Sequence, residues 1–185
     1  MKQQKTDNKK NTATGIVTLI LIVLVIMIIW PSHKEDEPAP DLSTPEGIFE
    51  SLNIKCSDLK IIPSGSNLQI SFTSEETAWD STAFVSRTVT DYIDYCKLAY
   101  TLDGVDHVDF YVFADFTDPK GHTVTEKAVA IGMPKDRFET YDWSGMLYKP
   151  GLYEQLEKDC DLLDLHAGLA SDVDTSEVEY KSTRK

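Results

Sequence analysis

The stretch VDHVDFYVFADFTDPKGHTVTEKAVAIGM, residues 105–133, contains two long segments of strand-like sequence on either side of a turn. Asp118–Gly121, with a proline and a glycine after an aspartate, is a strong turn signal. β-branched and aromatic residues are frequent before it, and residues 123–133 return as a second segment of similar length. This stretch predicts a β-hairpin, and it is the strongest structural signal in the chain.

The first strand of this hairpin has one apolar face and one mixed face, because successive side chains of a strand point to opposite sides of the sheet. The apolar face consists of Val108, Phe110, Val112, Ala114 and Phe116. The other face consists of His107, Asp109, Tyr111, Phe113 and Asp115. Two aromatic side chains on the second face call for an explanation. Either a further helix covers them, which is the commoner arrangement, or they form a partner-binding patch.

More strands and helices are predicted on both sides of the hairpin. Residues 59–62 and 68–73 flank a turn at 63–66, and the second segment alternates cleanly, so they predict another hairpin. Apolar residues at helical spacing predict three helices, over residues 45–53, 81–100 and 150–165. Antiparallel hairpins with separate helices are typical of the α+β class. We therefore predict an α+β domain with an antiparallel sheet of about four strands and helices packed on it.

A transmembrane helix is predicted before this domain. Residues 15–30 carry no charge, and with Ala13 and Thr14 they would extend roughly 27 Å as a helix, which nearly spans a bilayer. The lysines of residues 1–14 indicate that the N-terminus stays in the cytoplasm, so the domain lies outside it. A cleaved signal peptide is the alternative. The length of the apolar run and the absence of a small-residue cleavage pair favour an uncleaved anchor.

These patterns divide the chain into five parts. They are a basic cytoplasmic head at 1–14, a transmembrane anchor at 15–30, a Pro-rich acidic linker at 31–44, an extracytoplasmic α+β domain at 45–169 and a disordered tail at 170–185. The formal net charge of the 185 residues is −13, although the head is basic. Because phosphate recognition depends on Lys and Arg, an acidic domain argues against a nucleic-acid partner.

Four short motifs carry a resemblance to known proteins. They are Trp79-Asp80-x-x-x-Phe84, Val105-Asp106-x-Val108 leading to Asp118-x-x-Gly121, Asp142-Trp143, and His166-Ala167-Gly168-Leu169. Over roughly residues 55–170 the chain resembles small exported or membrane-anchored α+β proteins of unassigned function from Gram-positive bacteria. The resemblance implies an anchor followed by a single domain, and it brings no catalytic residue with it.

Three cysteines, Cys56, Cys96 and Cys160, would lie in an oxidising compartment, where an even number suggests disulfides. Their number is odd. Cys96 and Cys160 lie on apolar helix stripes, which favours buried thiols that pack as small hydrophobic side chains. A Cys96–Cys160 disulfide between two packed helices is the alternative.

Residues with catalytic or metal-binding chemistry are few. Asp103, Asp106, His107 and Asp109 are the nearest approach to a metal site. His107 and Asp109 share a strand face, but two ligands are too few to specify a metal. A G-x-S-x-G motif and a Gly-rich phosphate loop are both absent from the sequence. We therefore predict no catalytic residue, no metal and no cofactor.

The leading functional hypothesis is a non-enzymatic, single-pass membrane protein that serves as a binding or accessory module of an envelope complex, for example in secretion or conjugation. Its candidate binding patch consists of His107, Asp109, Tyr111, Phe113 and Asp115. The alternative is a cell-envelope hydrolase that uses His107 with neighbouring carboxylates, which would require a cleft. A spacer whose acidic surface limits adsorption to anionic polymers is a third hypothesis.

Overall fold

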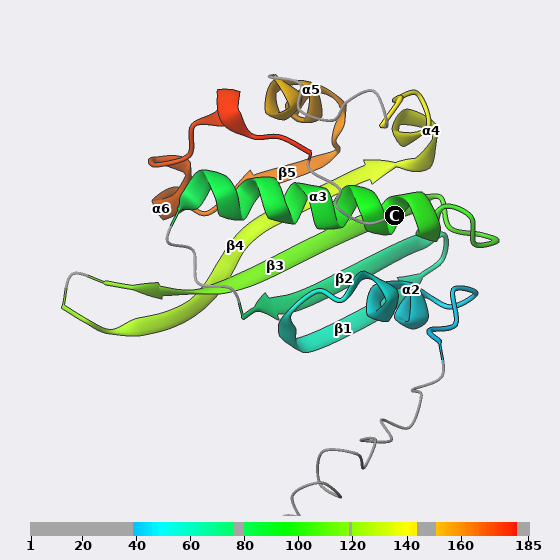
Figure 1. The fold of residues 1–185 in the computed structure, drawn as a ribbon, viewed down its shortest axis with the longest axis horizontal. Coiled ribbons are helices and arrows are strands. Elements are labelled where there is room, and N and C mark those ends of the chain that lie inside the picture. The colour runs from blue at the N-terminus through cyan, green and yellow to red at the C-terminus, as the bar shows by residue number, and fades with distance from the viewer. Residues whose placement is uncertain (1–38, 76–79, 119, 144–150, 181–185) are drawn as a thin grey trace, which may run out of the picture. The chain divides into compact units, whose positions relative to one another are not determined.

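The hairpin of residues 105–133 is confirmed as strands β3 (His107–Thr117) and β4 (Thr123–Pro134), which pair antiparallel. A β-bulge after Val112 shifts their register by one residue. Figure 1 shows these strands at the middle of the sheet in a computed structural model of the chain. The structure describes residues 39–75, 80–118, 120–143 and 151–180.

The second predicted hairpin is also confirmed. It consists of β1 (Cys56–Ser64) and β2 (Asn67–Ser74), joined by a turn at Gly65. The φ angle of Gly65 is 64°, a conformation that glycine adopts without the steric cost of a side chain. The predicted apolar positions of β2 are all buried, namely Leu68, Ile70 and Phe72. The alternation in this short segment therefore predicted its faces correctly.

The sheet as a whole differs from the prediction in size and in one strand direction. It is a mixed five-stranded sheet with the order β1-β2-β3-β4-β5, in which β2 and β3 are parallel. Parallel neighbours need a long crossover, and α3 (Ser81–Ala99) provides it by returning the chain to the starting end of β2. The prediction of an antiparallel sheet is wrong at this junction, because alternation determines the faces of a strand but not its direction.

Helices α2 (Pro45–Leu52) and α3 each begin after a residue whose side chain caps the first turn. The Thr44 hydroxyl accepts a hydrogen bond from the Gly47 amide at 3.1 Å, and the Asp80 carboxylate accepts one from the Ala83 amide at 3.0 Å. The apolar stripe predicted for α3 is buried, namely Val85, Val89, Tyr92, Ile93, Cys96 and Tyr100. Both helices cover one face of the sheet (Figure 1).

Phe110 is the residue at which the sheet and α3 meet in the core. Its ring is fully buried and makes near-perpendicular contacts with the rings of Phe72 and Tyr92, at centroid distances of 5.7 and 5.4 Å. The hydroxyl of Tyr92 donates a hydrogen bond to the backbone oxygen of Val108 at 3.2 Å. The buried phenol is therefore satisfied, and it ties α3 directly to β3.

The predicted helix at 150–165 is shorter than expected, and a strand follows it. The helix α5 covers Leu152–Asp159, and β5 (Leu162–Leu165) pairs antiparallel with β4. The extended backbone of Cys160 ends the helix. A short apolar run fits either a helix or a strand, and the open edge of β4 decides in favour of the strand. The described residues of this region also include two one-turn helices, α4 (Lys135–Phe138) and α6 (Ala167–Ala170).

The predicted disordered tail differs from the structure, which describes it as far as residue 180. A 3₁₀ turn, η1, covers Thr175–Glu177, and the side chains of Val178 and Tyr180 are 0% and 1% exposed. Both join the hydrophobic core. The polar composition of residues 170–185 concealed these two apolar anchors, so the folded domain continues beyond residue 169.

The predicted cytoplasmic head and transmembrane anchor lie outside the described residues, as does the first part of the linker, up to residue 38. Among the described residues, none of the helices has both the length and the apolar character needed to cross a bilayer.

Candidate binding face of the sheet

The face of the sheet that points away from the core is the candidate functional site. On β3, the core-facing residues Val108, Phe110 and Val112 are buried among the helices. The alternate residues form the outer face, which is defined here as His107, Asp109, Tyr111, Phe113 and Asp115 together with the strand residues beside them. The helices α2 and α3 lie on the opposite side (Figure 1).

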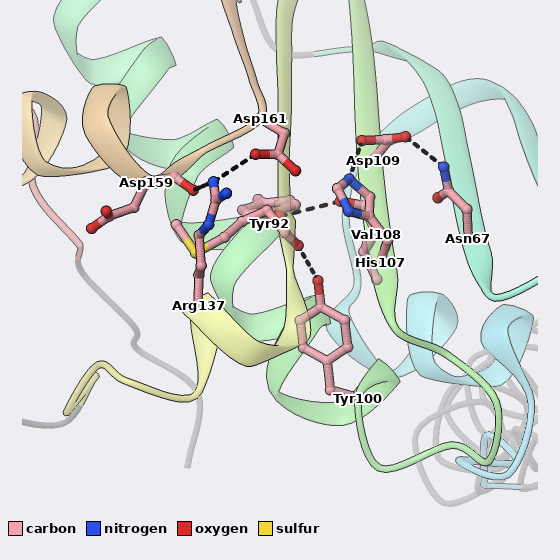
Figure 2. Close-up of polar contacts among 10 residues, drawn as sticks. Asn67, Tyr92, Tyr100, His107, Val108, Asp109, Arg137, Asp159 and Asp161 are labelled. Carbon is pink, nitrogen blue, oxygen red and sulfur yellow. Dashed lines mark hydrogen bonds and ion pairs between the residues drawn. The ribbon is translucent and has the colours of Figure 1, made fainter.

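A polar cluster of Asn67, His107 and Asp109 occupies one end of this face (Figure 2). The Asp109 carboxylate oxygen Oδ1 lies 3.0 Å from His107 Nε2, and Oδ2 accepts a hydrogen bond of 3.0 Å from Asn67 Nδ2. The contact between His107 and Asp109 confirms that these residues share a face. The parallel register, which places Asn67 opposite His107, brings in the third member.

Gly132 on β4 makes room for the carboxylate at the centre of this cluster. It is the register partner of Asp109, and a Cβ atom at this position would overlap Asp109 Oδ1. Asp109 is only 9% exposed although it lies on the outer face of β3. Its two partners and its position over a glycine therefore hold a nearly buried carboxylate on the surface of the sheet.

Tyr111 and Phe113 continue the outer face along β3, and both side chains are half-buried. Small residues flank Tyr111 on both sides, because its register partners are Ser71 on β2 and Ala130 on β4. Farther along, Asp115 is exposed and accepts a hydrogen bond of 2.6 Å from the Thr125 hydroxyl. The two aromatic rings therefore offer apolar contact area within a mostly polar surface.

Within the described residues, the polar cluster consists of a histidine, an aspartate and an asparagine. The His107–Asp109 pair resembles a general base with its orienting carboxylate, but catalysis of this type also needs a nucleophile within hydrogen-bond distance of the base. Among the described residues, the side-chain partner of His107 is Asp109. In the same part of the chain, no three His, Cys, Asp or Glu side chains come together in a way that could hold a metal ion.

The three cysteines are free thiols in the structure, and their environments suppress the thiolate form. Burial raises the pKa of the Cys96 thiol well above its usual value. Burial, with the nearby carboxylates Asp159 and Asp161, raises the pKa of Cys160 to about 12. Burial also raises the pKa of Cys56, beside Glu75. None of these thiols has the lowered pKa of a catalytic cysteine.

We expect Cys160 in the native chain to react very slowly with Ellman's reagent at pH 8. A pKa of about 12 instead of 9.0 leaves roughly 1,000-fold less thiolate than an ordinary cysteine has. Unfolding in guanidinium without reductant should then release three reactive thiols per chain. If only one thiol appears under these conditions, the Cys96–Cys160 disulfide is present and the free-thiol state is wrong.

Two residues of the cluster, Asn67 and Gly132, were missed in the sequence. Asn67 looks like an ordinary turn residue at the end of a hairpin, and only the parallel pairing of β2 with β3 places it beside Asp109. Gly132 could have been recognised from the sequence, because a glycine inside a strand often marks the close approach of another group.

Comparisons with known proteins do not indicate a function for the polar cluster or for the rest of the outer face. The resemblance to small Gram-positive exported proteins stays a prediction, since no protein-family model, curated protein or solved structure matches the chain.

Proposed function

We propose that this chain is a single-pass membrane protein whose extracytoplasmic domain binds a protein partner of the cell envelope through the outer face. The observation that carries the proposal is the pair of half-buried aromatic rings, Tyr111 and Phe113, on the side of the sheet away from the helices. Exposed apolar area of this kind, bordered by polar groups, is typical of interaction surfaces.

The edge of the sheet supports binding through the face rather than through strand addition. The edge strand β1 has an irregular register between Ser57 and Lys60, with a φ of 54° at Asp58. It also carries a lysine at 60 and a proline at 63. Bulges, lysines and prolines are the features by which natural edge strands resist pairing with other chains. The β1 edge is therefore poorly suited to strand addition, which supports binding through the outer face instead.

The membrane part of the proposal rests on residues 1–30. An uncharged apolar segment follows four lysines, which is the arrangement of an anchor whose N-terminus remains in the cytoplasm. Protease added to intact cells should therefore digest the domain while the head stays protected. Protection of the whole chain would contradict the proposed orientation.

The binding face can be tested by site-specific photo-crosslinking in intact cells. A photoreactive phenylalanine analogue at position 111 or 113 should give a discrete crosslinked product, because the half-buried rings are expected to contact the partner directly. Val124, an apolar residue of β4 that is 53% exposed, provides the matched control position. The crosslink from position 111 should also disappear when Phe113 is replaced by serine.

The hydrolase alternative makes the opposite prediction. Replacing His107 with alanine should leave the crosslinked product unchanged if the aromatic pair is the binding element, since His107 is bonded within its own strand to Asp109. If the crosslink survives Phe113→Ser but is lost with His107→Ala, or if position 124 gives the same product as 111, the proposed face is wrong.

A further inference from the structure

The C-terminal residues 173–180, called the strap below, lie along α3 on the helix side of the domain (Figure 1, red). Two backbone amides of the strap are held by hydroxyl side chains of the helix. The amide of Asp174 donates to Thr82 Oγ1 at 3.0 Å, and that of Glu179 donates to Ser86 Oγ at 3.2 Å. These bonds engage the backbone of the strap, so they do not depend on its side chains.

Two alternate side chains of the strap enter the core. Val178 and Tyr180 are almost completely buried, whereas Glu179 between them is half-buried. This is the period-2 pattern of an extended segment that presents every second side chain to a surface. The ring of Tyr180 meets the ring of Trp143 at 75° with a centroid distance of 6.4 Å.

The hydroxyl of Tyr180 is recognised by a charged pair on α3. It donates a hydrogen bond of 2.6 Å to Asp94 Oδ1 and accepts one from Lys97 Nζ. The ammonium group of Lys97 also lies 4.6 Å from the centre of the tyrosine ring. Because Asp94 is only 6% exposed, a phenylalanine in this place would leave a nearly buried carboxylate without its hydroxyl partner.

The residues that receive the strap all lie earlier in the chain than the strap itself. All five strands end before residue 166, and α3 precedes β3 in the chain. The strap follows β5 in the chain and is connected to it through α6 and a turn at residues 171–172. The strap surface is defined as four residues of α3 and one residue that follows α4, namely Thr82, Ser86, Asp94, Lys97 and Trp143.

We propose that the strap surface is a recognition site for an extended peptide of apolar-x-Tyr sequence from a partner protein, and that the chain's own strap occupies it as a competitor. Backbone hydrogen bonds that supply affinity, with alternate side-chain contacts that supply specificity, are the usual mode of extended-peptide recognition. Val178 and Tyr180 show which sequence fits. This inference is independent of the outer face and goes beyond the function proposed for it.

Tethering determines how strongly the strap competes. A segment joined by a short connection has an effective concentration on the order of millimolar, so a free peptide at micromolar concentration cannot displace it. A partner would need either a high local concentration or a weakened strap. The wild-type chain should therefore hide the site in an ordinary binding experiment.

The test uses the full-length chain in detergent with Tyr180→Ala, which weakens the strap without removing it. The probe is the fluorescein-labelled peptide DVDTSEVEY, residues 172–180. Fluorescence anisotropy should show binding to the Y180A chain at least tenfold tighter than to the wild type. A peptide with phenylalanine in place of its tyrosine should bind Y180A roughly tenfold more weakly, because the hydrogen bond to the Asp94 carboxylate is lost.

Ile62→Ala is the matched control, since it removes a half-exposed apolar side chain from β1 and leaves the strap in place. It should bind the peptide as weakly as the wild type. The proposal is overturned if folded Y180A binds no better than wild type, or if the tyrosine and phenylalanine peptides bind equally. It is also overturned if Y180A loses its cooperative thermal transition, because the rest of the domain then depends on the strap for its folding.

Discussion

Replacing Phe110 with alanine is expected to destabilise the domain by about 3–5 kcal/mol, the usual cost of removing a fully buried aromatic side chain. The ring is 0% exposed and contacts three other rings. Besides Phe72 and Tyr92, it lies 5.3 Å from the ring of Tyr95. Its loss would leave a cavity between β3 and α3 that the surrounding aromatic rings cannot fill without leaving their preferred geometry.

Phe113→Ala is the matched control, because it removes the same side chain from the same strand on the outer face, where the ring is only half-buried. It should cost about 1 kcal/mol. Urea titrations followed by tryptophan fluorescence and circular dichroism measure both values. Equal costs for Phe110→Ala and Phe113→Ala would mean that the outer face is as tightly packed as the core, which would contradict its assignment as an open surface.

Replacing Gly132 with alanine is expected to destabilise the domain by about 2 kcal/mol. In a strand interior, alanine is ordinarily favoured over glycine by about 0.5–1 kcal/mol. At this position its Cβ would overlap Asp109 Oδ1 and push the carboxylate away from His107 and Asn67. A nearly buried carboxylate that loses its partners costs more than the alanine gains.

A double-mutant cycle separates this explanation from a general intolerance of side chains in β4. Asp109→Ala should cost about 1–2 kcal/mol alone, since it leaves Asn67 Nδ2 without its partner. In the Asp109→Ala background, however, Gly132→Ala should cost almost nothing, because the overlapping oxygen is gone. If the two costs simply add, the close approach of Asp109 to Gly132 does not control this site.

Alternation predicted the faces of the central strands well. The burial of Val108, Phe110 and Val112, and of the stripe on α3, follows from the spacing of apolar residues alone. The capping residues Thr44 and Asp80 are also local features, because each satisfies an amide that the adjoining helix leaves free at its first turn. These features depend on neighbours within a few positions, which a sequence displays directly.

The errors share a different origin. The parallel pairing of β2 with β3, the strand β5 and the order of the C-terminal strap all depend on partners distant in the chain. The run at 162–165 fits either a helix or a strand, and its pairing with the edge of β4 decides between them. Tyr180 lies in a polar stretch of the sequence, and only the folded structure shows that its hydroxyl group bonds with Asp94 and Lys97. Asn67 was missed as a member of the candidate site for the same reason, because its partner Asp109 is distant in the sequence.

By itself, the sequence determined that a hairpin of residues 105–133 would build an α+β domain, and which side chains of β3 would leave the core, because both follow from the period-2 geometry of a strand. Only the tertiary structure decided that a crossover makes β2 and β3 parallel, that Gly132 leaves room for a nearly buried Asp109, and that residues 174–180 bind α3. Hydrogen bonding and packing between distant segments are decided by the whole assembled core, which no local pattern encodes.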